Sequence, residues 1–208
     1  MKLEAIEAAR LILADAREQV EAMRASRTNG KGYDAFRKAW RYFLTSYYVT
    51  FQKLRAGADG NAASEAWCRA LVNFCKGDEL LNYLHQARNH SDHGLGMSAP
   101  LDPPRLEQVR DFNARVAPDR IGKELMINLV GTKGQKPLAR LKVTMPKSAR
   151  LVAVTDERSG KVYSSPTMHL GQRLKSMSIM DAADLALDFV ESKVEEAAAM
   201  AKGARGAA

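Results

Sequence analysis

The chain lacks the cysteines that hold many small secreted domains together. Its 208 residues include only two, Cys68 and Cys75. They lie seven residues apart in a segment predicted to form one helix, which separates them by about 10 Å along the axis and prevents a disulfide between them. A disulfide framework is therefore excluded, and reduced thiols indicate a cytoplasmic protein.

Long apolar runs are also missing. No uninterrupted stretch approaches the roughly 20 apolar residues that a membrane span requires. The first ten residues carry acidic side chains where a signal peptide would be apolar. We therefore expect no association with a membrane.

Motifs that bind cofactors or metals are absent as well. The sequence has no Gly-rich phosphate loop, no Cys/His metal spacing and no Gly-x-Ser-x-Gly nucleophile elbow, so we predict no cofactor and no metal. It does have an excess of positive charge, with 32 Lys+Arg against 24 Asp+Glu and a formal net charge of +8. This excess is compatible with a polyanionic partner such as RNA.

The first half of the chain shows the repeat of apolar residues that is typical of amphipathic helices. A helix is predicted over 2–26, and a second, antiparallel helix follows the breaker stretch 28–32. A third lies between the break at 57–61 and Gly77, and a fourth begins after Asp78, which can cap its first turn. The residues expected in the core are, helix by helix, Ile6, Ala9, Leu13, Ala16, Val20 and Met23; Phe36, Trp40, Phe43, Tyr47, Thr50 and Leu54; Trp67, Ala70, Leu71 and Phe74; and Leu80, Leu81, Tyr83, Leu84 and Ala87.

The second half of the chain differs from the first in having several prolines and short segments in which apolar and polar residues alternate. Four prolines between 94 and 122 favour a loop with one short helix at 106–116. Alternation of apolar and polar residues at 125–129 and 141–144 predicts half-buried strands. A further strand over 151–154 is expected to turn at 156–160 and return at 161–164.

These patterns predict an α+β fold, with an N-terminal antiparallel helical bundle, a small antiparallel strand region and a C-terminal helix. The last helix is expected to start near Ser178, with Asp181 completing a capping box, and its tail over 201–208 is expected to fray. The predicted parts are a helical bundle over 1–94, a linker over 95–122, and over 123–202 a small sheet whose C-terminal helix packs back on the bundle.

The fourth predicted helix concentrates the polar chemistry of the chain, since three of the four histidines lie in it. At 100° per residue its polar side chains fall on an arc opposite the apolar face, directed toward solvent or a partner chain. The arc consists of His85, Arg88, Asn89, Asp92 and His93.

Arg88, Asn89 and His93 form a set that suits phosphate chemistry. A guanidinium matches phosphate oxygens and can stabilise the charge of the transition state, so Arg88 is the candidate phosphate ligand. A neutral imidazole can accept the proton of a ribose 2′-hydroxyl, which makes His93 the candidate general base. Asn89, one turn before His93, can orient its ring. Arg37 and Arg41, together with Lys38, are further candidates for contacts with RNA phosphates.

The stretch Arg88-Asn89-His90-Ser91-Asp92-His93 resembles the Arg-x4–6-His motif of the HEPN superfamily (higher eukaryotes and prokaryotes nucleotide-binding domains), including the polar residue after the Arg. The resemblance implies an up-and-down bundle of about four helices that dimerises through the motif-bearing helix. In active members it implies metal-independent endoribonuclease activity in the cleft between two motifs. Only Arg88, Asn89 and His93 carry over by position.

The resemblance covers residues 1 to about 94 and leaves the strand-rich half outside it. The same helix also resembles that of uncharacterised bacterial proteins with a Tyr-Leu-x-x-Ala-Arg-Asn-x-x-x-His-Gly pattern. Some toxin members of the superfamily have a Tyr two residues after the His, where their antitoxin acts. This sequence has Gly94-Leu95 there, so that regulation is not supported.

Two functions have support in the sequence, and a third class, a purely structural or assembly component, stays open without a positive signal. The first is a metal-independent endoribonuclease acting as a homodimer. The second is a non-catalytic module for dimerisation or for binding a protein partner. In the alternative without a functional role, Arg88 and Asp92, four residues apart, form a surface ion pair that stabilises the helix by a few tenths of a kcal/mol. His85 and His90 are expected to be solvated, and His169 to be structural or exposed.

Overall fold

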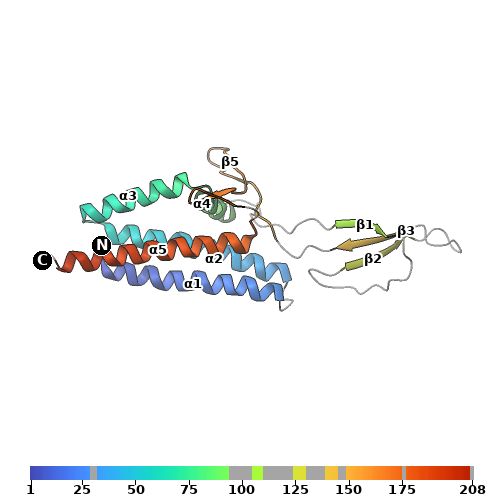
Figure 1. The fold of residues 1–208 in the computed structure, drawn as a ribbon, viewed down its shortest axis with the longest axis horizontal. Coiled ribbons are helices and arrows are strands. Elements are labelled where there is room, and N and C mark those ends of the chain that lie inside the picture. Colours follow the sequence, from blue (N-terminus) through green and yellow to red (C-terminus); the bar gives the residue numbers. More distant parts are fainter. Residues whose placement is uncertain are drawn as a thin grey trace.

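The computed structural model describes residues 1–28, 32–93, 105–109, 124–129, 139–144, 149–174 and 177–206. Helices dominate this part of the chain, and short antiparallel strands lie between the fourth helix and the last, so the predicted α+β fold class is confirmed (Figure 1). The helices are α1 (Leu3–Thr28), α2 (Gly32–Ala58), α3 (Ala62–Gly77), α4 (Glu79–His93) and α5 (Ile179–Gly206).

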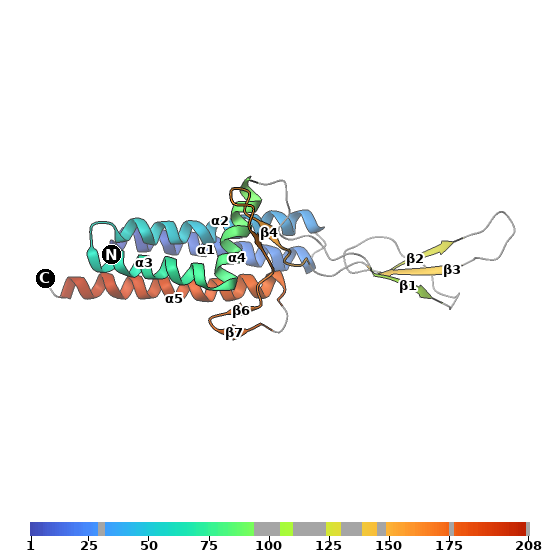
Figure 2. The same ribbon diagram turned by 90° about the horizontal axis from the view of Figure 1, so that it is seen from above.

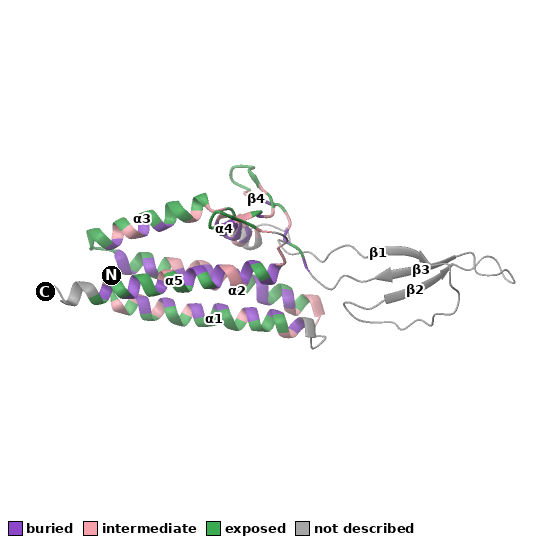
Figure 3. Ribbon diagram, viewed as in Figure 1, coloured by how far each residue is buried: buried purple, intermediate pink, exposed green. Residues whose placement is uncertain are grey.

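Helices α1 and α2 form an antiparallel pair, as predicted. The backbone N–H of Lys2, at the start of α1, donates to the carbonyl of Gly57, near the end of α2, at 2.8 Å. The helices approach so closely there that a Cβ on Gly57 would lie 2.4 Å from the Cβ of Ala5. Every residue expected in the core from these two helices is buried, which confirms both apolar stripes (Figure 3).

Helix α5 returns along the bundle and packs on α1 and α2 (Figure 2). Its predicted capping box is present, because the N–H of Asp181 donates to Ser178 Oγ at 3.1 Å and the N–H of Ser178 donates to Asp181 Oδ2 at 3.0 Å. The expected fraying from residue 201 is wrong over the described residues, since the helix continues to Gly206. The α1–α5 ion pairs are Arg10–Glu195, Arg17–Glu191 and Arg24–Asp184.

The core prediction for α3 is confirmed for Leu71, holds in part for the half-buried Trp67, and is wrong for Ala70 and Phe74. The buried residues are Ser64, Cys68 and Leu71, whereas Ala70 is exposed and Phe74 is 47% exposed. The reason is that α3 has two neighbours. The small residue Cys68 contacts α2, where its thiol lies 3.8 Å from the Leu54 carbonyl oxygen, whereas the aromatic residues Trp67 and Phe74 contact α5. The ring of Phe74 stacks on that of Phe189 at 5.6 Å between centroids, and the indole N–H of Trp67 donates to Glu196 Oε2 at 3.3 Å.

Three strands form one antiparallel sheet in the order β1-β3-β2, which Figure 2 draws beyond one end of the helices. Strands β2 (Glu124–Leu129) and β3 (Ala139–Thr144) confirm the strands predicted at 125–129 and 141–144. Strand β1 (Arg105–Val109) corrects the expected helix at 106–116, because this segment pairs with β3 from Arg105↔Thr144 to Val109↔Arg140. Sheet pairing satisfies the backbone groups that a helix would have paired locally. Residues 110–116 of that prediction lie outside the described residues.

Two short hairpins connect this sheet to α5. The first, β4 (Val154–Thr155) with β5 (Val162–Tyr163), confirms the predicted turn and return. The second, β6 (Met168–His169) with β7 (Gln172–Arg173), has no counterpart in the sequence analysis. Both contribute to the surroundings of α4. Over the described residues, none of the helices combines the length and apolarity needed to cross a membrane.

Candidate functional site on the polar face of helix α4

Helix α4 begins where the sequence predicts. The N–H of Leu81 donates to Asp78 Oδ1 at 3.0 Å, which caps the first turn. The expected apolar face is buried, and its members Leu80, Leu81, Tyr83, Leu84 and Ala87 are at most 1% exposed. Because this face is anchored in the bundle, the polar face is held at a defined orientation against α2.

Four side chains meet on that polar face, and one of them comes from α2. The guanidinium carbon of Arg88 lies 4.5 Å from the ring centroid of Tyr48, and the His85 ring lies 5.6 Å from the same ring. Nη1 of Arg88 donates to Asn89 Oδ1 at 3.2 Å, and Asn89 Nδ2 lies 3.4 Å from His85 Nε2. We call Tyr48, His85, Arg88 and Asn89 the α4 cluster. A cation over an aromatic face is stabilised by about 0.5–2 kcal/mol, so Tyr48 restrains the guanidinium.

The hydrogen bonds of the cluster determine the state of His85. Since the Asn89 carbonyl oxygen accepts from Arg88, its amide nitrogen is the donor toward His85 Nε2, which must then be unprotonated. Part of the His85 residue is exposed, but the ring lies among protein atoms whose desolvation lowers its pKa, and the charges of Arg88 and Lys76 lower the pKa further. His85 is therefore a neutral imidazole at pH 7, which can accept a proton.

A cavity of about 830 Å³ opens beside the cluster. His85, Asn89 and His90 form one wall, and the β4–β5 turn forms the opposite one. Nδ1 of His90 is buried and has no hydrogen-bond partner within the described part of the chain. The turn brings two acidic and one basic side chain, and Lys76 adds a second positive charge. The remaining lining residues are Gln86, Thr155, Asp156, Glu157 and Arg158.

The structure brings two of the three predicted catalytic residues into contact. Arg88 and Asn89 are in direct contact. His93 is the last residue of α4, and its side chain lies outside the described residues. Arg37 and Arg41 are exposed on α2, where Arg37 pairs with Asp34 at 3.3 Å. Both occupy the helix face of Tyr48, about 16 and 10 Å from it along the axis.

Sequence reasoning missed the parts that Tyr48 and His85 play. In α2 it is Tyr47, and not Tyr48, that belongs to the predicted apolar stripe. Only the crossing of α2 and α4 shows that Tyr48 supports Arg88. His85 is exposed, as expected, but its contacts with Tyr48 and Asn89 were not predicted. The 3.6-residue repeat that places His85 one turn before Asn89 is the one signal for their contact.

His169 is structural, as expected, although it is buried rather than exposed. It is 5% exposed, and its Nδ1 lies 3.0 Å from Asp78 Oδ1. The N–H of Leu170 donates to Asp78 Oδ2 at 2.7 Å. Next to it, Glu79 Oε2 accepts from the N–H groups of Thr167 and Met168. The β6–β7 hairpin is thereby fastened to the amino end of α4, opposite the end that carries the predicted motif.

Comparisons of the chain with protein-family models, with curated proteins and with solved structures found no match. Among the described residues, no group of three or more His, Cys, Asp or Glu side chains is arranged to hold a metal ion.

Proposed function

We propose that this chain is a HEPN-like, metal-independent endoribonuclease that acts as a homodimer, with Arg88, Asn89 and His93 of each protomer facing a shared cleft. The observation that carries the proposal is the α4 cluster. Tyr48 and Asn89 restrain the guanidinium of Arg88 next to an unprotonated imidazole. Two members of the cluster, His85 and Asn89, line a cavity of about 830 Å³, whereas Arg88 does not line it.

Arg88 would bind the scissile phosphate and stabilise its developing negative charge. A general base would remove the proton of the 2′-hydroxyl, whose oxygen then attacks phosphorus. The bond from phosphorus to the 5′-oxygen breaks, the leaving oxygen takes up a proton, and a 2′,3′-cyclic phosphate forms. His93 is the base that the family resemblance implies. His85 is the second candidate for the same role, in which its Nε2 must exchange the hydrogen bond from Asn89 for one from the 2′-hydroxyl.

The test is cleavage of a fluorescently labelled single-stranded RNA by the purified full chain in EDTA. We expect a cyclic-phosphate product, loss of cleavage by at least 100-fold in Arg88→Gln, and a similar loss in His93→Ala or His85→Ala, whichever is the base. Arg10→Gln is the matched control, because this arginine lies on α1 in an exposed pair with Glu195. Arg37→Gln and Arg41→Gln should weaken RNA binding without abolishing turnover.

Absence of cleavage by the wild-type chain, or unchanged cleavage by Arg88→Gln, would refute the nuclease. The second candidate, a non-catalytic dimerisation or partner-binding module, is favoured by the same contact of Arg88 with Tyr48, since that contact also fastens α4 to α2. It predicts that Arg88→Gln weakens self-association in sedimentation measurements while no RNA is ever cleaved.

A further inference from the structure

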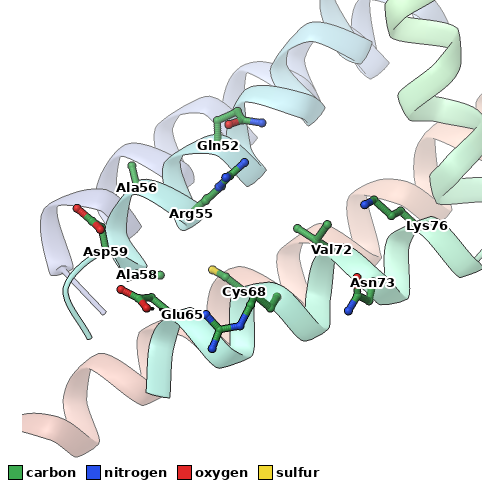
Figure 4. A pocket seen from close by; sticks show the side chains of 11 residues that line it. Gln52, Arg55, Ala56, Ala58, Asp59, Glu65, Cys68, Val72, Asn73 and Lys76 are labelled. Atoms are coloured by element: carbon green, nitrogen blue, oxygen red, sulfur yellow. Dashed lines mark ion pairs between the residues drawn. The ribbon is translucent and has the colours of Figure 1, made fainter. Parts of the chain in front are cut away.

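A second cavity, of about 370 Å³, lies between α2, α3 and α4. Its apolar wall is formed by Tyr47, Phe51, Leu54, Leu71, Val72 and Cys75. The lining is completed by Tyr48, Gln52, Arg55, Cys68, Lys76, Asn82, His85 and Gln86. It continues into a groove along α2 and α3, of about 900 Å³, which shares Gln52, Arg55, Cys68, Val72 and Lys76 with it. Figure 4 shows Arg55 on α2, Cys68 and Val72 on α3, and Lys76 at the end nearest α4. The space is therefore elongated and apolar at its deep end.

Two exposed, positively charged side chains border this apolar space. Arg55 and Lys76 both line the cavity, no acidic residue lines it, and neither cation forms an ion pair within the described residues. Arg69, in the adjoining groove, differs because it pairs with Glu65 at 3.8 Å. An apolar pocket bordered by unpaired cations attracts an anion that has an apolar body.

The hydroxyl of Tyr47 supplies a donor in the wall of the cavity. Tyr47 is 4% exposed, lines the cavity, and forms no hydrogen bond within the described part of the chain. Burial, together with the nearby charges of Cys75 and Asp78, raises its pKa well above 10, so the phenol keeps its proton. A phenol in the wall of a cavity can donate a hydrogen bond to a ligand that enters it.

We propose that this cavity binds a long-chain fatty carboxylate. Its carboxylate accepts a hydrogen bond from the Tyr47 hydroxyl and pairs with Lys76, and its alkyl chain lies against Phe51, Leu54 and Val72 and extends into the groove between α2 and α3. Arg55 adds positive potential at the mouth. The cavity shares Tyr48 and His85 with the α4 cluster, but the contacts proposed for the carboxylate and its alkyl chain use no residue of that cluster. Binding of palmitate and cleavage of RNA are therefore tested separately.

The test is calorimetric titration of the full chain with palmitate below its micellar concentration. We expect saturable one-to-one binding, at least tenfold weaker in Lys76→Gln and about threefold weaker in Tyr47→Phe. Lys53→Gln, an exposed lysine of α2 that lines neither space, should bind as the wild type does. Val72→Trp, which fills the cavity and removes no charge, should also weaken binding, with far-UV circular dichroism confirming that it folds.

Hexadecanol, which has the same chain and no charge, should bind at least tenfold more weakly than palmitate. Failure of palmitate to saturate the wild-type chain, equal binding by Lys76→Gln and wild type, or equal binding of hexadecanol would each overturn the proposal.

Discussion

Replacing Asp78 by Ala should destabilise the protein far more than an ordinary carboxylate substitution. The Asp78 side chain is 6% exposed and accepts from Leu81 N–H, His169 Nδ1 and Leu170 N–H. Loss of a helix cap costs about 1 kcal/mol. A buried donor left without its acceptor costs about 1–3 kcal/mol more, and this applies to His169. We expect a loss of about 2–4 kcal/mol in the free energy of unfolding, measured by urea denaturation.

The matched control is Asp34→Ala, in which an Asp side chain that is 89% exposed loses one exposed ion pair with Arg37. Such pairs contribute about 0–1 kcal/mol. If Asp78→Ala costs no more than Asp34→Ala, the hairpin is not fastened to α4 through this carboxylate, and the argument is wrong.

The same carboxylate predicts a pH dependence. Burial alone would raise the pKa of Asp78, but the hydrogen bonds from Leu81, His169 and Leu170 outweigh it, so the pKa is lowered in the folded state. A lowered pKa stabilises the folded state above the unfolded value of about 3.9, and the stabilisation is lost as the pH falls through the folded value. The stability difference between wild type and Asp78→Ala should therefore shrink below about pH 4. A difference that stays constant there would contradict the assignment.

Two further predictions concern close packing and titration. Gly57→Ala should lower the free energy of unfolding by about 1–3 kcal/mol in urea denaturation, because the new methyl group would overlap Ala5. Gly77→Ala, whose Cβ would meet nothing within 4 Å, should leave it unchanged or raise it slightly. Equal effects of the two variants would contradict the close approach of α1 and α2. In an NMR titration, the midpoint for His85 should lie below pH 6.5. Lys76→Gln should move this midpoint upward, because a nearby positive charge is removed. A midpoint above 6.5 in the wild type would show that the imidazole is not desolvated as described.

The helices could be predicted almost completely because their signals are local. The stripe from Ile6 to Met23 and the stripe from Phe36 to Leu54 are both buried in the structure. In α3 the same method was right for Leu71 and wrong for Phe74, because Trp67 and Phe74 contact α5, a helix more than 100 residues further along the chain. Strand β1 was missed for a related reason, since its extended form depends on β3 as a partner.

The sequence alone determined that α4 has an apolar face, an amino-terminal cap and an opposed polar face with Arg88 and Asn89 on it. These properties follow from residue spacing within one helix, so no other part of the chain is needed to derive them. Only the tertiary structure decided that Tyr48 lies under Arg88, that His169 pairs with Asp78, and that α2, α3 and α4 enclose an apolar cavity. Each of these depends on which distant surfaces meet, and packing of the whole chain settles that.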